Sequence, residues 1–178
     1  MIKGLEHVLD VHPIFAGMDQ ETRHLIAGCG KNVVHEPGDY FIREGDEANV
    51  FYLIRHGRAA LEVHVPGREP IVIATAGENE VLGWAWLTPP YRWHFDVRAV
   101  EQIRAVSIDA VCLRAKCKAD PAVGFAFYKN FTPLIASRLD ATRLQLIDVY
   151  GQPKAAPEPE LESGPPAKPA PPKPADPQ

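Results

Sequence analysis

The chain has 178 residues and a formal net charge of −4, enough for one domain with a hydrophobic core and a further segment. An acidic balance gives no reason to expect sequence-independent binding of nucleic acid, which needs a basic surface. No apolar run approaches the roughly 20 residues of a membrane span, and Glu6, His7 and Asp10 interrupt any signal-peptide core. We therefore expect a cytoplasmic protein without membrane contact.

The N-terminal segment has helical spacing over residues 2–9, and Asp10 to Pro13 ends it. Asp19 is typical of an N-cap, and it predicts a second helix over 20–27 that ends before Gly28 and Gly30.

From Lys31 the pattern changes to short alternating strands separated by glycine, proline and asparagine turns. The predicted strands are 33–35, 40–42, 50–55, 59–65, 71–75, 81–82, 95–100 and 103–108. Such regular spacing predicts a mainly β fold with flanking helices, built as an antiparallel double-stranded β-helix, a jelly-roll-like β-roll, over 31–109.

Two C-terminal helices follow over 110–150. Asp109 caps the first, 110–119, and the second runs from Pro121 to about Tyr150. Pro133 lies inside the second helix, so we expect a kink or a break near 129–133.

An apolar stripe with 4-3-4-3 spacing follows that proline. Its residues are Ile135, Leu139, Thr142, Leu146 and Val149. The stripe favours a homodimer through the C-terminal helix, and an ordinary helix packed on its own domain is the alternative.

The domain is predicted to occupy residues 1–151. The segment 152–178 contains ten prolines and little apolar bulk, which predicts a disordered tail. Such a tail either offers a polyproline II ligand to a partner protein or serves as a solubilising tether.

The sequence contains neither a metal-binding cysteine pattern nor a catalytic motif, so we expect no enzyme. Cys29, Cys112 and Cys117 lack a CxxC or Cys/His metal spacing, so we expect reduced, buried thiols and no metal. No Gly-x-Ser-x-Gly elbow, Walker loop or dinucleotide fingerprint is present.

The most informative stretch is Gly83–Glu101, which holds all three tryptophans of the chain. A strand, a glycine, one helical turn and a returning strand leave backbone N–H groups free to bind an anion. The candidate ligand-binding residues are Gly83, Trp84, Ala85, Trp86, Arg92, Trp93, His94, Asp96 and Arg98. The alternative is a tryptophan-rich core with a solvated edge of arginine and aspartate.

The run PGDYFIREGDEANVFYLIRHGRAAL, with its flanking helices, resembles the cyclic-nucleotide-binding domain of the CRP/FNR family. The resemblance covers about residues 5–150. It implies a β-roll with N-terminal helices, a long C-terminal helix and a phosphate-binding cassette in the tryptophan-rich stretch.

The cassette departs from the pattern of that family. The resemblance places Trp84 where a glutamate holds the ribose and Trp93 where an arginine holds the cyclic phosphate. Losing a guanidinium removes the clamp that best fits a phosphate. Arg92 or Arg98, with protonated His94, is the alternative phosphate ligand, and Asp96 would repel an anion unless Arg98 neutralises it.

The resemblance implies a stand-alone regulatory sensor that binds cAMP, cGMP or a similar small anion, needs no cofactor and signals through an unknown partner protein. A degenerate, ligand-free interaction module is the alternative. A metal-dependent cupin-type enzyme is a third hypothesis, but it needs an HxH pair, which the sequence lacks. The long helix runs into the proline-rich tail rather than a helix-turn-helix, so we expect no direct nucleic-acid binding.

Overall fold

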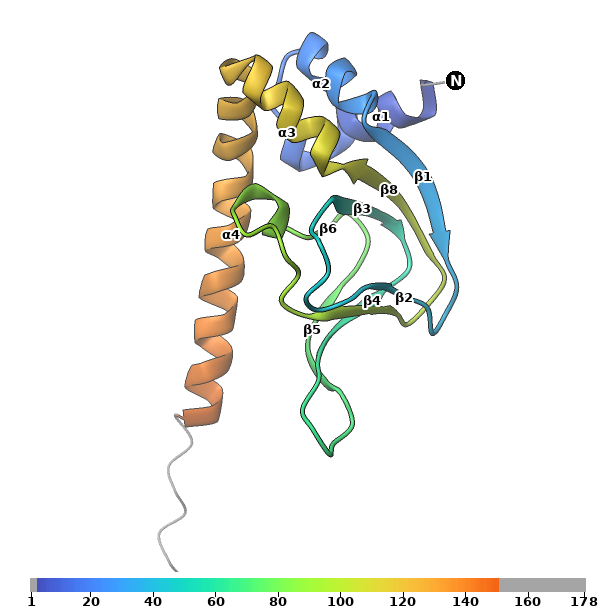
Figure 1. The fold of residues 1–178 in the computed structure, drawn as a ribbon, viewed down its shortest axis with the longest axis vertical. Coiled ribbons are helices and arrows are strands. Elements are labelled where there is room, and N and C mark those ends of the chain that lie inside the picture. Colours follow the sequence, from blue (N-terminus) through green and yellow to red (C-terminus); the bar gives the residue numbers. More distant parts are fainter. Residues whose placement is uncertain (1–2, 151–178) are drawn as a thin grey trace, which may run out of the picture. The chain divides into compact units, whose positions relative to one another are not determined.

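The computed structural model describes residues 3–150 and consists of two four-stranded antiparallel sheets with helices before and after them (Figure 1). The first sheet has the order β1 (Gly30–His35), β8 (Ile103–Asp109), β3 (Val50–His56) and β6 (Val81–Leu82). The second has the order β2 (Tyr40–Ile42), β7 (Asp96–Ala99), β4 (Ala59–Val63) and β5 (Ile71–Ala76). The predicted β-roll and its strands are confirmed.

The N-terminal helices are α1 (Lys3–Val11), the 3-10 turn η1 (Pro13–Phe15) and α2 (Gln20–Ala27). Asp19 accepts a hydrogen bond of 2.7 Å from the Thr22 N–H, so the predicted N-cap of α2 is present. Asp109 accepts from the Cys112 N–H at 2.8 Å and begins α3 (Ala110–Ala119) in the same way. Both caps satisfy an N–H that the helix leaves without a partner.

The helix α4 (Pro121–Tyr150) is continuous through Pro133, so the expected break into two helices is wrong. Phe131 before the proline is fully buried, and Leu134 after it packs against the same core. This packing holds both sides of the proline in one helix despite the missing N–H.

The core lies between the two sheets and under the helices. Successive strand residues point to opposite faces, and the inward residues of β7 and β4 are Val97, Ala99, Ala59 and Leu61. Of the described residues, 3–140 form one compact unit that contains this core, and the end of α4 belongs to a second unit. Across residues 3–150, no helix is long and apolar enough to cross a membrane.

The prediction that all three cysteines are reduced is wrong for two of them. Cys29 and Cys112 form a disulfide, and Cys117 is free. The two bonded residues are 83 positions apart in sequence, but β1 pairs with β8 and the Asp109 N–H donates to the Cys29 carbonyl at 2.8 Å. Strand pairing therefore brings the two sulfur atoms together.

Candidate functional site

The tryptophan-rich stretch forms a turn between the two sheets. It starts at Gly83, directly after β6, where φ is +93°. A single turn of 3-10 helix, η2 (Ala85–Leu87), follows, with Trp84 at its N-cap and no side-chain cap bond. The chain then passes the prolines at 89 and 90 and returns as β7. The predicted strand, glycine, turn and strand are all present.

The indole of Trp93 lies against Gly83. A methyl group added to Gly83 would lie 2.8 Å from Cζ3 of Trp93 and closer still to Cη2. Trp93 is only 3% exposed and belongs to the main core. The ring therefore occupies the space directly above the glycine that begins the turn.

Trp86 is also a core residue. Its ring stacks on Phe51 with centroids 4.9 Å apart and meets Phe127 and Phe131 edge-on. Offset and edge-to-face arrangements of this kind add to the energy of apolar burial. Trp86 thus joins the turn to β3 and α4, while Trp84 remains half-exposed.

Arg92 and His94 are exposed to solvent. Arg92 donates to the Gly45 carbonyl at 2.6 Å and pairs with Glu47 in an isolated β-bridge.

Asp96 and Arg98 lie on the outer face of the second sheet, because their neighbours Val97 and Ala99 point into the core. The pair suggested by sequence does not form. Arg98 binds Glu62, which is 2% exposed, and Arg43 donates to Asp96 at 2.8 Å. Asp96 and Arg98 therefore lie on the opposite face of β7 from the core, to which Trp93 belongs.

The outer face of the second sheet is an ordered network of opposite charges. The register places Glu62 opposite Asp96. The Tyr40 hydroxyl donates to Glu62 at 2.9 Å, and the Arg43 guanidinium lies 3.7 Å from the centre of the Tyr40 ring. Each buried carboxylate has a cationic partner, as burial of charge requires.

These contacts change the acidity of both carboxylates. The hydrogen bond from Arg98 lowers the pKa of Glu62, burial opposes it, and the Tyr40 hydroxyl lowers it further. Burial alone would raise the pKa of Asp96, but hydrogen bonds from the Glu44 N–H and from Arg43 lower it overall. Both groups are therefore held in their charged forms.

The helices after the β-roll hold the cassette through polar contacts as well. Arg114 of α3 donates to the carbonyls of Ala48 and Trp86 at 3.2 Å each, and to Asn49 Oδ1 at 2.9 Å. Its guanidinium lies 4.4 Å from the centre of the Tyr91 ring, a cation–π contact. In α4, the Tyr128 hydroxyl donates to the Leu87 carbonyl at 3.3 Å.

Comparison with known proteins places the fold in a family. The model of the cyclic nucleotide-binding domain matches residues 32–120, half of the chain. This chain belongs to the cyclic nucleotide-binding domain family. The resemblance drawn from the turn residues of the sequence is therefore confirmed.

One relative is the cAMP-dependent protein kinase regulatory subunit of Schizosaccharomyces pombe, 38% identical over 73 residues, or 41% of this chain. The match spans only 17% of that relative. A cyclic nucleotide-binding domain from Methylobacillus flagellatus has a TM-score of 0.71 at 15% identity, covering 83% of this chain and 84% of that one. The catabolite activator protein of Thermus thermophilus has a TM-score of 0.61 at 23% identity, covering 78% and 63%.

In this cyclic nucleotide-binding domain, the structure brings Gly83, Trp84, Ala85, Trp86 and Trp93 together at the cassette turn. Sequence reasoning missed Glu62, the buried partner of Arg98, and Arg114, the residue that joins α3 to the cassette. Alternation gave no signal for Glu62, because it places this residue on the outward face of β4 and does not show that the position is buried.

Proposed function

We propose that this domain is a regulatory module that signals through a partner protein, and that Trp93 rather than a cyclic nucleotide occupies its phosphate position. The observation that carries this proposal is the burial of the Trp93 ring against Gly83. The resemblance assigns the phosphate-binding arginine to that same position, so the replacement fills the space as well as removing the charge.

The remaining cations do not replace that arginine. Arg92 reaches the Gly45 carbonyl, and Arg98 neutralises the buried Glu62 on the opposite face of β7. A phosphate is held best by a guanidinium with free donors and by open backbone N–H groups. At η2 the Leu87 N–H donates to the Trp84 carbonyl at 3.0 Å, so this N–H is not available to a phosphate.

A sensor of cAMP or cGMP is the second candidate function. It is favoured by the match to a kinase regulatory subunit whose name includes cAMP dependence. Binding in this candidate requires the Trp93 ring to leave Gly83, since a ligand and the ring cannot share that space. The two candidates therefore predict different behaviour of the same tryptophan.

The test is titration of the full chain with cAMP and with cGMP, followed by calorimetry and by tryptophan fluorescence. We expect no heat of binding and no change of emission at millimolar nucleotide. The Arg92→Ala variant serves as the matched control, and we expect it to behave like the parent chain. Saturable binding at micromolar nucleotide, weakened by Arg92→Ala, would overturn the proposal in favour of the sensor.

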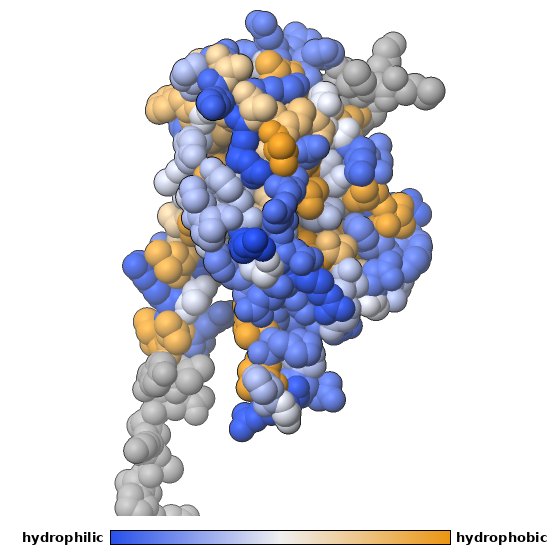
Figure 2. All heavy atoms as spheres, viewed as in Figure 1, coloured by the Kyte–Doolittle hydropathy of each residue, from blue (hydrophilic) through white to orange (hydrophobic). Residues whose placement is uncertain are grey.

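We also propose that α4 mediates homodimerisation. Leu139 is 51% exposed and Leu146 is 50% exposed, and apolar side chains lie on the surface of this helix (Figure 2). Thr142 is exposed too, whereas Ile135 packs partly against the domain's own core. The side chain of Val149 and the tail 152–178 lie outside the described residues, so the proposals for them rest on sequence alone.

A further inference from the structure

We propose that the Cys29–Cys112 disulfide is a reversible redox site, opened by a dithiol reductant that reaches it through an adjacent cavity. Its state would set how firmly the first turn of α3 is held on the β-roll. This proposal goes beyond the proposed function and does not depend on whether a nucleotide binds.

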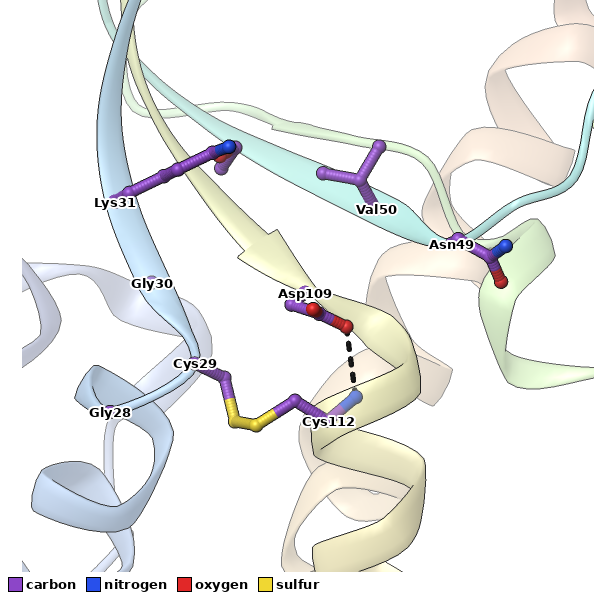
Figure 3. Close-up of a pocket in the computed structure, with 9 residues that line it drawn as sticks. Gly28, Cys29, Gly30, Lys31, Asn49, Val50, Asp109 and Cys112 are labelled. Carbon is purple, nitrogen blue, oxygen red and sulfur yellow. Dashed lines mark hydrogen bonds between the residues drawn. A yellow bond between two sulfur atoms is a disulfide. The ribbon is translucent and has the colours of Figure 1, made fainter.

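The disulfide forms part of the wall of a cavity of about 400 Å³ (Figure 3). The cavity is lined by Gly28, Cys29, Gly30, Lys31, Asn49, Val50, Ser107, Asp109 and Cys112. Cys29 is 8% exposed and Cys112 is half-buried, so Cys112 is the more exposed of the two residues. A buried structural disulfide lacks such access, and access is one of the factors that set the rate of thiol–disulfide exchange.

The exchange itself needs only the reductant. A thiolate of the dithiol attacks Sγ of Cys112, which forms a mixed disulfide and breaks the bond to Cys29. Cys29 leaves as a thiolate and takes up a proton. The second thiol of the reductant then attacks the mixed disulfide and releases Cys112, so two electrons and two protons pass from the dithiol to the protein.

A cation lies beside the residue that precedes Cys29. The Lys116 ammonium donates to the Leu25 carbonyl at 2.6 Å and would lie 3.4 Å from a methyl group on Gly28, the residue before Cys29. A neighbouring ammonium stabilises a thiolate. The position of Lys116 beside Gly28 favours Cys29 as the leaving thiolate once Cys112 is attacked.

Opening the bond changes one connection and leaves the others in place. Cys29 lies between α2 and β1, whereas Cys112 lies in the first turn of α3 (Figure 3). Without the bond, α3 is still held by buried Leu113 and by the hydrogen bonds of Arg114. The reduced chain is thus expected to stay folded with a looser α3.

The predicted cytoplasmic location favours a disulfide that opens and closes. The sequence predicts a cytoplasmic protein, and disulfides in reducing compartments are usually transient, either catalytic or redox-sensing. A bond beside an open cavity in such a protein fits a cycle between oxidised and reduced forms better than a permanent cross-link.

The test measures thiols in the full chain under native conditions. Protein is acid-quenched before and after millimolar dithiothreitol, then alkylated with N-ethylmaleimide in denaturant and weighed intact. We expect one adduct before reduction, on Cys117, and two more after it, with an unchanged far-ultraviolet circular dichroism spectrum. Amide exchange over 110–119 should become roughly tenfold faster, while β3 and β8 keep their protection.

Two variants complete the experiment. The Cys29→Ser/Cys112→Ser double variant should show the faster exchange with or without dithiothreitol. The Cys117→Ser variant, as the matched control, should still gain two adducts on reduction. Cysteines that are free in the isolated chain and pair on addition of oxidised dithiothreitol would also support the proposal.

Three results would overturn it. The first is a bond that dithiothreitol reduces only after denaturant has unfolded the chain. The second is a pair of free thiols that no disulfide oxidant joins. The third is reduction that leaves amide exchange over 110–119 unchanged.

Discussion

The ring of Trp93 fills the space that a side chain on Gly83 would occupy, so a methyl group at position 83 would clash with it. Gly83 has φ of +93°, a conformation that side-chain-bearing residues rarely adopt. The contact joins the start of the cassette turn to its end and gives it one packed arrangement.

Gly83→Ala should lower the free energy of unfolding by about 2–4 kcal/mol, because it adds a clash to an unfavourable φ. Trp93→Ala should cost about 3–5 kcal/mol through the cavity it leaves. The double variant should cost at least about 0.5 kcal/mol less than the two single losses combined, since the clash disappears. Urea denaturation of the four proteins measures this difference.

Gly38→Ala is the matched control for the backbone contribution. Gly38 has φ of +94° and no atom within 4 Å of an added methyl group, so its loss reports the conformational penalty alone. A Gly83→Ala loss no larger than that of Gly38→Ala would contradict the packed arrangement.

Arg98→Met should destabilise the domain at pH 7 by more than the loss of an exposed ion pair does, because it leaves the buried carboxylate of Glu62 without its cation. The pKa of Glu62 is lowered in the folded state, chiefly by Arg98. The stabilisation that Arg98 gives to ionised Glu62 is therefore complete above the pKa of a glutamate in the unfolded chain, about 4.3. It is lost as the pH falls through the lower pKa that Glu62 has in the folded chain. Denaturation at pH 7 and at pH 3 should show the difference shrinking.

Arg58→Met provides the comparison for the Arg98 variant. Arg58 pairs with Glu101 at 2.7 Å, but both side chains are about half-exposed or more. Exposed pairs contribute less than about 1 kcal/mol. Equal losses for the two variants would show that burial of Glu62 is not the cause.

His12→Asn should make the domain less sensitive to mild acid. Burial lowers the pKa of His12, although the nearby Asn79 backbone opposes this effect. The unfolded chain therefore binds a proton first, and the free energy of unfolding falls as the pH drops below about 6.5, by at most about 1.4 kcal/mol per pH unit. Thermal melts from pH 8 to pH 5 measure the effect.

The asparagine is chosen because its Oδ1 can accept the Ile14 N–H, as His12 Nδ1 does at 3.2 Å. His94→Asn is the control, since His94 is exposed, and it should leave the pH profile unchanged. A parent chain whose melting temperature is constant over this range would refute the prediction.

Leu139→Asp/Leu146→Asp should convert a homodimer to a monomer without unfolding the β-roll, because both side chains are about half-exposed and a charge in an apolar interface is unfavourable. Sedimentation velocity of the parent and variant chains checks the result. Leu144→Asp, an exposed residue outside the stripe, is the control. A parent chain that is monomeric at all concentrations would refute it.

Local patterns in the sequence were sufficient for much of the fold. Alternation located the strands, and Asp19 and Asp109 marked the helix starts because capping is a short-range interaction. The same alternation put Asp96 and Arg98 on one side of β7, which is correct. Alternation does not say which strand lies alongside, and so Arg43 and Glu62 could not be identified as their partners.

Long-range packing decided the remaining features. The Cys29–Cys112 bond depends on the pairing of β1 with β8, which no local pattern contains. The continuity of α4 depends on Phe131 being buried, which outweighs the local effect of Pro133. The burial of Trp93 likewise could not be predicted, because it depends on where the fold places Gly83 relative to the ring.

Arg114 holds the Trp86 carbonyl, the Asn49 side chain and the Tyr91 ring with a single guanidinium. Sliding α3 by a fraction of a helical turn would strain all of these bonds at once, so intermediate placements are unfavourable. The cassette and α3 are therefore expected to move together as one body. A displacement of α3 would then shift the cassette between two distinct positions rather than gradually.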